Sequence, residues 1–219
     1  MNINDQLVEN GIIIPNNSIF IKEKEIKDLL ESLSKSLSQH NKINRIYVKS
    51  NSNKEEYFIA DDTVIELFHT KLSLSRLIEA WIKLLFISSL KNNIKKTKVI
   101  FRTENNYKSQ IIESPGSIDS NLILEEYINI FKNYSEKCLP LPPESAYKYV
   151  EAKIKLKNEK KAFTDKWIGN KTFSKGEKDN IEMKLCFGNE KEPNFFFGNN
   201  NFDKLSFRLY GPLIEALKK

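Results

Sequence analysis

The longest apolar stretch of the chain joins a strand-like segment to a helix, between Thr63 and Ser89. Val64 to Phe68 is typical of a buried strand. The helix that follows is apolar on most of its circumference, at Leu72, Leu74, Leu77, Ile78, Trp81, Ile82, Leu84, Leu85 and Ile87. We expect other elements to cover such a helix on several sides. Three charged residues interrupt the run, so it does not have the pattern of a membrane span.

The pattern before and after this helix predicts the rest of an α/β core. Apolar positions keep helical spacing from about Glu23 to Gln39, at Ile26, Leu29, Leu30, Leu33 and Leu37. Short alternating runs predict strands over 44–49, 55–60 and 63–69, and their short connections predict an antiparallel meander. Another strand is expected over 98–102. The predicted order is therefore helix, three strands, helix, strand.

The second half of the chain predicts a series of helices. One helix is expected to bury Leu124, Tyr127, Ile128, Phe131 and Tyr134, and three prolines between 138 and 143 end it. Pro143 suits the first turn of the next helix. That helix carries Tyr147, Val150 and Ile154, passes through a lysine-rich stretch and ends at Gly169. A short segment over 181–186 and a helix from about Phe202 to Leu217 follow.

Composition indicates only the broad class of protein. The 219 residues are 40% hydrophobic and 29% charged, which is ordinary for a globular protein, and the net charge of +6 fits an acidic partner without requiring one. Cys138 and Cys186 form no CxxC pair, and the N-terminus lacks a secretory pattern. We expect a cytoplasmic protein with a single domain over 1–219, made of a core over about 20–136 and a helical C-terminal extension over about 137–219.

Three segments of the second half occur in an order that matches a known family. They are Leu122–Lys153, with its leucine- and proline-rich turn, Lys160–Gly188 and Phe202–Leu217. They contain Ala162, Trp167, Gly169, the pair Gly176-Glu177 and the pair Pro212-Leu213. In this order they resemble the C-terminal domain of RecC, the gamma subunit of exodeoxyribonuclease V. Ala162 and Trp167 lie five residues apart where that family has four. Lys71–Leu85 and Gly11–Pro15 resemble it more weakly.

The resemblance implies a fold and a role. It implies an α/β (α+β) domain with a PD-(D/E)XK nuclease-like core, a central mixed sheet flanked by helices, which has lost its active site. Such a domain would serve a RecBCD-type helicase–nuclease complex in double-strand break repair, with RecB-like and RecD-like subunits and DNA as partners. It implies no cofactor and no membrane. The predicted element order agrees with this core, although many α/β domains share it.

The residues at the nuclease position support the loss of the active site. A working site needs a carboxylate and then Glu/Asp-x-Lys on the next strand, so that carboxylates bind Mg²⁺ and the lysine orients water. Here Asp61 and Asp62 end the second strand and Glu66 lies in the third, but Phe68 stands where the lysine is needed. Shifting the register by one places Leu67 and His69 at these positions. We interpret the aspartates as turn residues and Glu66 as facing solvent.

One alternative retains catalysis. A divergent Mg²⁺-dependent nuclease could use Asp61 or Asp62 with Glu66 and a lysine from elsewhere in the chain. Glu182-Met183-Lys184 also spells Glu-x-Lys, but it lies in a predicted helix, where residues two apart point to different sides. No metal site is expected from the cysteines and histidines. A third possibility is a stand-alone interaction domain that uses the C-terminal helices.

Two further sets of residues are candidates for contacts with partners. Lysines that could contact DNA phosphates are Lys91, Lys95, Lys96, Lys153, Lys157, Lys160 and Lys161, with solubility as the competing interpretation. Phe195, Phe196 and Phe197 stand beside a glycine and three asparagines. They are either buried anchors or an exposed patch that meets another subunit.

Overall fold

A mixed sheet forms the centre of the protein. The computed structural model describes residues 19–38, 42–50, 53–170, 174–188 and 191–217. In these residues β1 (Asn44–Ser50), β2 (Asn53–Ala60), β3 (Thr63–Phe68), β4 (Lys96–Arg102) and β5 (Tyr107–Glu113) form a five-stranded sheet in the order β1-β2-β3-β4-β5. The first three strands are antiparallel, β4 is parallel to β3, and β5 is antiparallel to β4. The predicted meander is thus confirmed. The predicted Gly11–Pro15 segment lies outside the described residues.

The helix α3 (Leu74–Leu90) connects the two parallel strands and covers one face of the sheet. Ser73 begins it, since its side chain accepts a hydrogen bond from the Arg76 amide at 3.3 Å. Residues on several sides of α3 are buried, namely Leu77, Ala80, Trp81, Leu84, Leu85, Ile87 and Ser88. They form the sheet core with Tyr57, Val64, Phe68, Val99 and Ile112. The expectation of a helix covered on several sides is confirmed.

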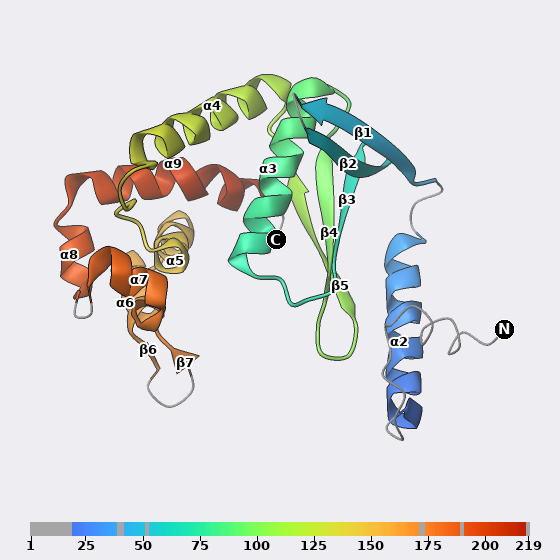
Figure 1. The fold of residues 1–219 in the computed structure, drawn as a ribbon, viewed down its shortest axis with the longest axis horizontal. Coiled ribbons are helices and arrows are strands. Elements are labelled where there is room, and N and C mark those ends of the chain that lie inside the picture. Colours follow the sequence, from blue (N-terminus) through green and yellow to red (C-terminus); the bar gives the residue numbers. More distant parts are fainter. Residues whose placement is uncertain (1–18, 39–41, 51–52, 171–173, 189–190, 218–219) are drawn as a thin grey trace.

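The helix α2 (Ile19–Leu37) covers the opposite face, so that the sheet lies between two helical layers (Figure 1). Leu33 and Leu37 pack against a small cluster that contains Ile65 and Ile100. The Ser32 hydroxyl accepts a hydrogen bond from the Tyr107 amide at 2.9 Å and so ties α2 to β5. Leu30 was expected to be buried, but it is 51% exposed. The predicted fold class, a mixed sheet flanked by helices, is confirmed.

Two features of the central part differ from expectation. Strand β5 was not predicted, because Tyr107–Glu113 lacks an alternating apolar pattern. It pairs with β4 through backbone hydrogen bonds.

In α4 (Ser117–Tyr134), the predicted buried face was partly wrong. Ile128 and Phe131 are 50% and 73% exposed, whereas Ile130 is buried. The helix has apolar residues on several sides, and only those that contact neighbouring elements are buried.

The helical extension folds around an aromatic cluster. Its elements are α5 (Pro143–Ile154), α6 (Glu159–Ile168), β6 (Gly169–Asn170), β7 (Ser174–Lys175), η1 (Glu177–Asp179), α7 (Ile181–Phe187), α8 (Pro193–Phe197) and α9 (Asn200–Ala216). The helix expected to run from Pro143 to Gly169 is in fact two helices. Leu156 has φ of +53° after α5, and the Asn158 side chain caps α6 by accepting a hydrogen bond from the Lys161 amide. Gly169 ends α6 as predicted.

The extension packs directly on the sheet core. The helix α9 contributes Leu213 to the sheet core and the adjacent Ile214 to the aromatic cluster, whose large members include Phe163, Trp167, Phe196 and Phe202. The Trp81 indole N–H donates to the Tyr127 hydroxyl at 3.1 Å, and that hydroxyl donates to the Leu209 carbonyl at 2.7 Å. One polar chain therefore joins α3, α4 and α9.

Candidate functional site

The turn between β2 and β3 holds the two aspartates that a nuclease would use. Asp61 adopts φ of +53° in this turn, a conformation that aspartate tolerates better than most residues. Asp62 accepts a hydrogen bond from the Thr63 hydroxyl at 2.9 Å, and its other oxygen lies 3.7 Å from the Lys95 ammonium. Both aspartates thus have the turn position that the sequence predicted.

The interpretation of Glu66 as a solvent-facing residue was wrong. Its side chain points towards α3, and the residue is 8% exposed. The Lys83 ammonium lies 3.1 Å from its carboxylate and 3.3 Å from that of Glu79. Burial alone would lower the pKa of Lys83, but the attraction of Glu66 and Glu79 raises it above its ordinary value. Glu66 is therefore held by a charged partner on the core helix.

The residues at the nuclease position do not converge. Asp62 lies in the turn and Glu66 lies four residues later in β3, and at the rise of an extended strand this separates their Cα atoms by about 13 Å. Leu67 faces the opposite side of β3, in the cluster beneath α2. The His69 ring nitrogen lies 2.8 Å from the Tyr107 hydroxyl on the exposed edge of the sheet. Among the described residues, no three His, Cys, Asp or Glu side chains are placed to hold a metal ion.

The structure places the candidate lysines in two separate regions. Lys91 and Lys95 are exposed in the connection between α3 and β4, and Lys96 begins β4. The other four belong to α5, α6 and the turn between them. Lys153 is bound to Asp203 at 2.8 Å and lies over the Phe207 ring at 5.0 Å. Lys160 lies over the Phe197 ring at 5.6 Å but is exposed, as are Lys157 and Lys161.

The three consecutive phenylalanines form most of the short helix α8 and have different environments. Phe196 is completely buried, with its ring 5.0 Å from that of Trp167 and 5.2 Å from that of Phe187. Phe197 is partly buried in the same cluster. Phe195 is 48% exposed, and the Lys191 ammonium lies 4.3 Å from its ring centre. Phe196 cannot form an exposed partner patch, and Phe195 alone of the three is available for one.

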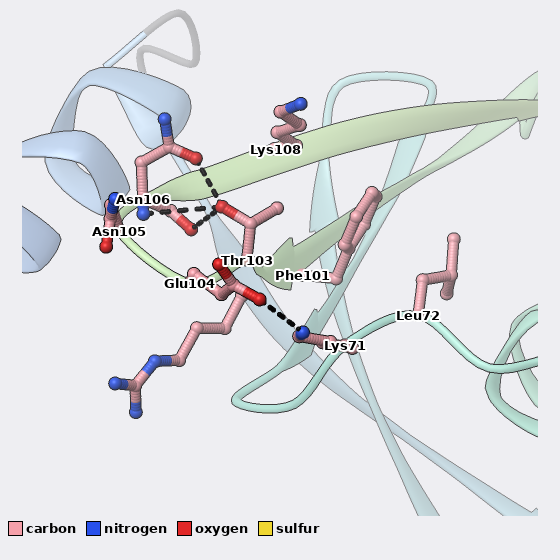
Figure 2. Close-up of a pocket in the computed structure, with 9 residues that line it drawn as sticks. Lys71, Leu72, Phe101, Thr103, Glu104, Asn105, Asn106 and Lys108 are labelled. Carbon is pink, nitrogen blue, oxygen red and sulfur yellow. Dashed lines mark hydrogen bonds and ion pairs between the residues drawn. The ribbon is translucent and has the colours of Figure 1, made fainter. Parts of the chain in front are cut away.

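A hollow of about 480 Å³ lies at the carboxyl ends of the parallel strands β3 and β4 (Figure 2). Lys71 and Leu72 line one side of it, and the turn between β4 and β5 lines the other. Lys71 is bound to Glu104 at 2.8 Å, and Thr103 is bound to Asn106 across the turn. None of these residues was predicted as a site residue, because they form no recognisable motif. Lys71, Arg102 and Lys108 are all exposed here, but only Lys71 forms an ion pair among the described residues.

A second hollow, of about 350 Å³, separates α4 from α9. Its apolar floor is Ile130 and Leu205, which are 5% and 6% exposed. The polar and aromatic lining residues are Asn133, Tyr134, Lys137, Asn201, Lys204 and Arg208. They include three cations and no carboxylate. Sequence reasoning did not find this set, because its two halves lie about 70 residues apart in the chain.

Comparison with known proteins gives the family. The model of the RecC C-terminal domain matches residues 23–154, which is more than half of the chain. This chain belongs to the RecC C-terminal domain family. The matched residues hold the whole five-stranded sheet and the helices α3, α4 and α5. The segments after Ile154 that resemble RecC in the sequence lie beyond the match. No curated protein matches the chain.

Membership of this family indicates the kind of complex in which the protein takes part. It suggests a component of a RecBCD complex in DNA repair. In the part of the chain that the structure describes, no helix is long and apolar enough to cross a membrane.

Proposed function

We propose that this RecC C-terminal domain is a non-catalytic structural and DNA-handling part of a RecBCD-type helicase–nuclease complex that acts in double-strand break repair. Family membership supports the setting, and RecB-like and RecD-like subunits are the proposed partners. The observation that supports the non-catalytic part is that the acidic residues do not converge, since among the described residues no three His, Cys, Asp or Glu side chains are placed to hold a metal ion. The Glu66 carboxylate is buried against the Lys83 ammonium on α3, and the two aspartates lie in the turn before β3.

The rest of the proposal concerns organisation and contacts. We propose that residues 1–219 form one domain, with the helical extension from about 137 packed on the nuclease-like core. The two clusters that meet at Leu213 and Ile214 support this. Lys91, Lys95, Lys96, Lys157, Lys160 and Lys161 are the lysines of the predicted set that we propose for contacts with DNA phosphates, whereas Lys153 is paired with Asp203. Phe195 is the remaining candidate for contact with a companion subunit.

The proposal is tested by two measurements on the purified chain. The first incubates it with linear double-stranded and single-stranded DNA and Mg²⁺, beside a known Mg²⁺-dependent nuclease, and we expect no cleavage. The second expresses it with RecB-like and RecD-like subunits and asks whether they purify together, which we expect. Cleavage that is lost on Asp62→Ala, or failure to assemble with both subunits, would contradict the proposal.

One observation favours the alternative of a divergent active nuclease. That alternative requires a lysine from outside the strand, and Lys83 lies 3.1 Å from Glu66. If the site is active, Glu66→Gln and Lys83→Met should each abolish Mg²⁺-dependent cleavage, whereas Glu182→Gln on the exposed face of α7 should leave it unchanged. Cleavage that persists in both variants would exclude this site as its source.

A further inference from the structure

The two cysteines of the chain are far apart in the sequence, but they meet at the surface of the fold. Cys138 lies in the segment between α4 and α5, and Cys186 is the penultimate residue of α7. Both thiols are free and exposed, and a hydrogen bond joins their side chains. This hydrogen bond, slight burial and the charge of a Cys138 thiolate raise the pKa of Cys186. The two sulfur atoms are therefore direct neighbours.

Packing on one common core holds the two cysteines side by side. The residue after each cysteine, Leu139 in one case and Phe187 in the other, belongs to the aromatic cluster of the extension. Phe187 is buried, and its ring lies 5.2 Å from that of Phe196. Each thiol thus stands at the rim of a cluster that fixes the backbone beside it. The sequence gave no sign of this proximity, because it results from packing between distant segments.

Two neighbouring exposed thiols can bind a soft metal ion or form a disulfide. Structural zinc sites have four protein ligands, and catalytic zinc sites have three besides water. In the part of the chain that the structure describes, no group of three or more His, Cys, Asp or Glu side chains could hold a metal ion. An ion would find only two ligands here, whereas a disulfide needs only the two sulfur atoms. The arrangement therefore favours a disulfide.

We propose that Cys138 and Cys186 form a reversible disulfide when the chain meets a small disulfide oxidant such as oxidised glutathione. One protein thiolate attacks a sulfur of the oxidant, forms a mixed disulfide and releases one glutathione thiolate. The second protein thiolate attacks the protein sulfur of the mixed disulfide and releases the second glutathione thiolate. The protein gives two electrons to the oxidant, and its two thiol protons end on the two glutathione molecules.

The link closes a loop around most of the helical extension. The elements between the two cysteines are α5, α6, β6, β7, η1 and most of α7. A closed loop gives the unfolded chain fewer conformations, so the link stabilises the folded state. In a reducing compartment the thiols stay free, and the link then forms only under oxidation. Neither this disulfide nor its test depends on the proposed role in a RecBCD-type complex.

The test incubates the reduced full chain with oxidised glutathione, blocks remaining thiols with N-ethylmaleimide and measures the intact mass. We expect a chain that is lighter by two hydrogen atoms and carries neither glutathione nor maleimide, at a rate that does not depend on protein concentration. Proteolysis should give two peptides joined through Cys138 and Cys186, and dithiothreitol should separate them. Glutathione adducts on both thiols without an internal link, or disulfide-linked dimers, would overturn the proposal.

A matched control keeps two thiols in the chain but moves one of them. Cys186→Ser with Lys184→Cys places the second thiol two residues earlier, at an exposed position on a different side of α7. The internal link should then form at least about tenfold more slowly, because the two sulfur atoms are no longer neighbours. Cys186→Ser alone should stop at one glutathione adduct. If the moved thiol links as fast as Cys186, the observed proximity has no effect and the proposal fails.

A second measurement asks whether the link stabilises the fold. The linked chain should unfold at a urea midpoint about 1 M above that of the reduced chain, as expected for a disulfide that fits the native structure. In unfolding urea, the equilibrium constant for the link should correspondingly be about a hundredfold smaller. Cys138→Ser with Cys186→Ser, treated with the same oxidant, should show no shift of the midpoint. A linked chain whose midpoint equals or falls below that of the reduced chain would show that the link does not fit the native fold, and would overturn the proposal.

Discussion

Glu177 is a single buried residue that determines how α5 begins. It is 4% exposed, and its carboxylate accepts hydrogen bonds from the Glu144 amide at 2.8 Å and from the Ser145 amide at 2.6 Å. The Ser145 hydroxyl also donates to it. Pro142 precedes the helix and has no side chain that could cap it. A carboxylate from a distant segment therefore satisfies the first amides of α5 and interacts favourably with the helix dipole.

This arrangement predicts a large effect of a conservative change. Glu177→Gln should lower the free energy of unfolding by about 2–3 kcal/mol, because the amide group turns a donor towards backbone donors and removes the charge. Urea unfolding measures this, with Glu182→Gln on exposed α7 as the control, expected within about 0.5 kcal/mol of the parent. Burial raises the pKa of Tyr210 and the Glu177 charge raises it further, so this pKa should fall in Glu177→Gln. Equal stability of the two variants would show that Glu177 is not a cap.

Buried tyrosines predict how stability depends on alkaline pH. Burial raises the pKa values of Tyr127, Tyr147, Tyr149 and Tyr210, that of Tyr147 to about 12. Between the unfolded value near 10 and the raised folded value, the unfolded chain loses protons that the folded chain keeps. The unfolded state therefore binds fewer protons, and stability must fall as pH rises from 10 to 12.

The contribution of one tyrosine can be isolated. At pH 11 Tyr147 should account for about 1.4 kcal/mol of the loss relative to pH 9, because one pKa unit corresponds to 1.36 kcal/mol. Tyr147→Phe keeps the ring and removes the ionisation, so this share of the loss should disappear in urea unfolding at the two pH values. Tyr47→Phe, on an exposed position of β1, is the control. An identical pH dependence of parent and Tyr147→Phe would disprove the assignment.

At the scale of elements, the helices and strands that were predicted correctly are those that depend on a local pattern of apolar residues. The alternation over 44–69 predicted three hairpin strands, and the apolar circumference of α3 predicted its central position, because burial on each face follows directly from such periods. Strand β5 was missed since its residues Tyr107–Glu113 are mostly polar and are held by the ladder with β4 and by Ser32 of α2. Ser32 lies 75 residues before Tyr107, and pairing with the neighbouring β4 does not require an apolar pattern in β5 itself.

The candidate site shows the same limit. The sequence shows that Phe68 stands where a Glu-x-Lys motif beginning at Glu66 would have its lysine, because this depends on two nearby residues. It could not reveal that Glu66 is buried against Lys83, which lies 17 residues later on α3. Phe196 and Phe195 are adjacent and chemically identical, yet one is completely buried and the other 48% exposed. Only the packing of α8 on α6 and α9 separates them.

At the scale of the whole molecule, the sheet core and the aromatic cluster share residues rather than meeting across a hinge. Ile78 and Tyr147 contact both clusters, and α9 contributes to both. The hydrogen bonds from Trp81 through Tyr127 to Leu209 cross the same boundary. Opening this boundary would expose apolar side chains on both sides and break buried hydrogen bonds. We therefore expect the core and the extension to unfold together.

The two tryptophans of the chain allow a direct test of this expectation. Trp81 lies in the sheet core and Trp167 in the aromatic cluster, and each is 1% exposed. In Trp81→Phe the remaining fluorescence reports the aromatic cluster, and in Trp167→Phe it reports the sheet core. Within each variant, the urea midpoints from fluorescence and from far-UV circular dichroism should coincide, as for a two-state unit. Comparison within a variant removes the effect of the substitution itself. Midpoints that differ by about 0.5 M or more in either variant would show two separately folding units and contradict the single domain over 1–219.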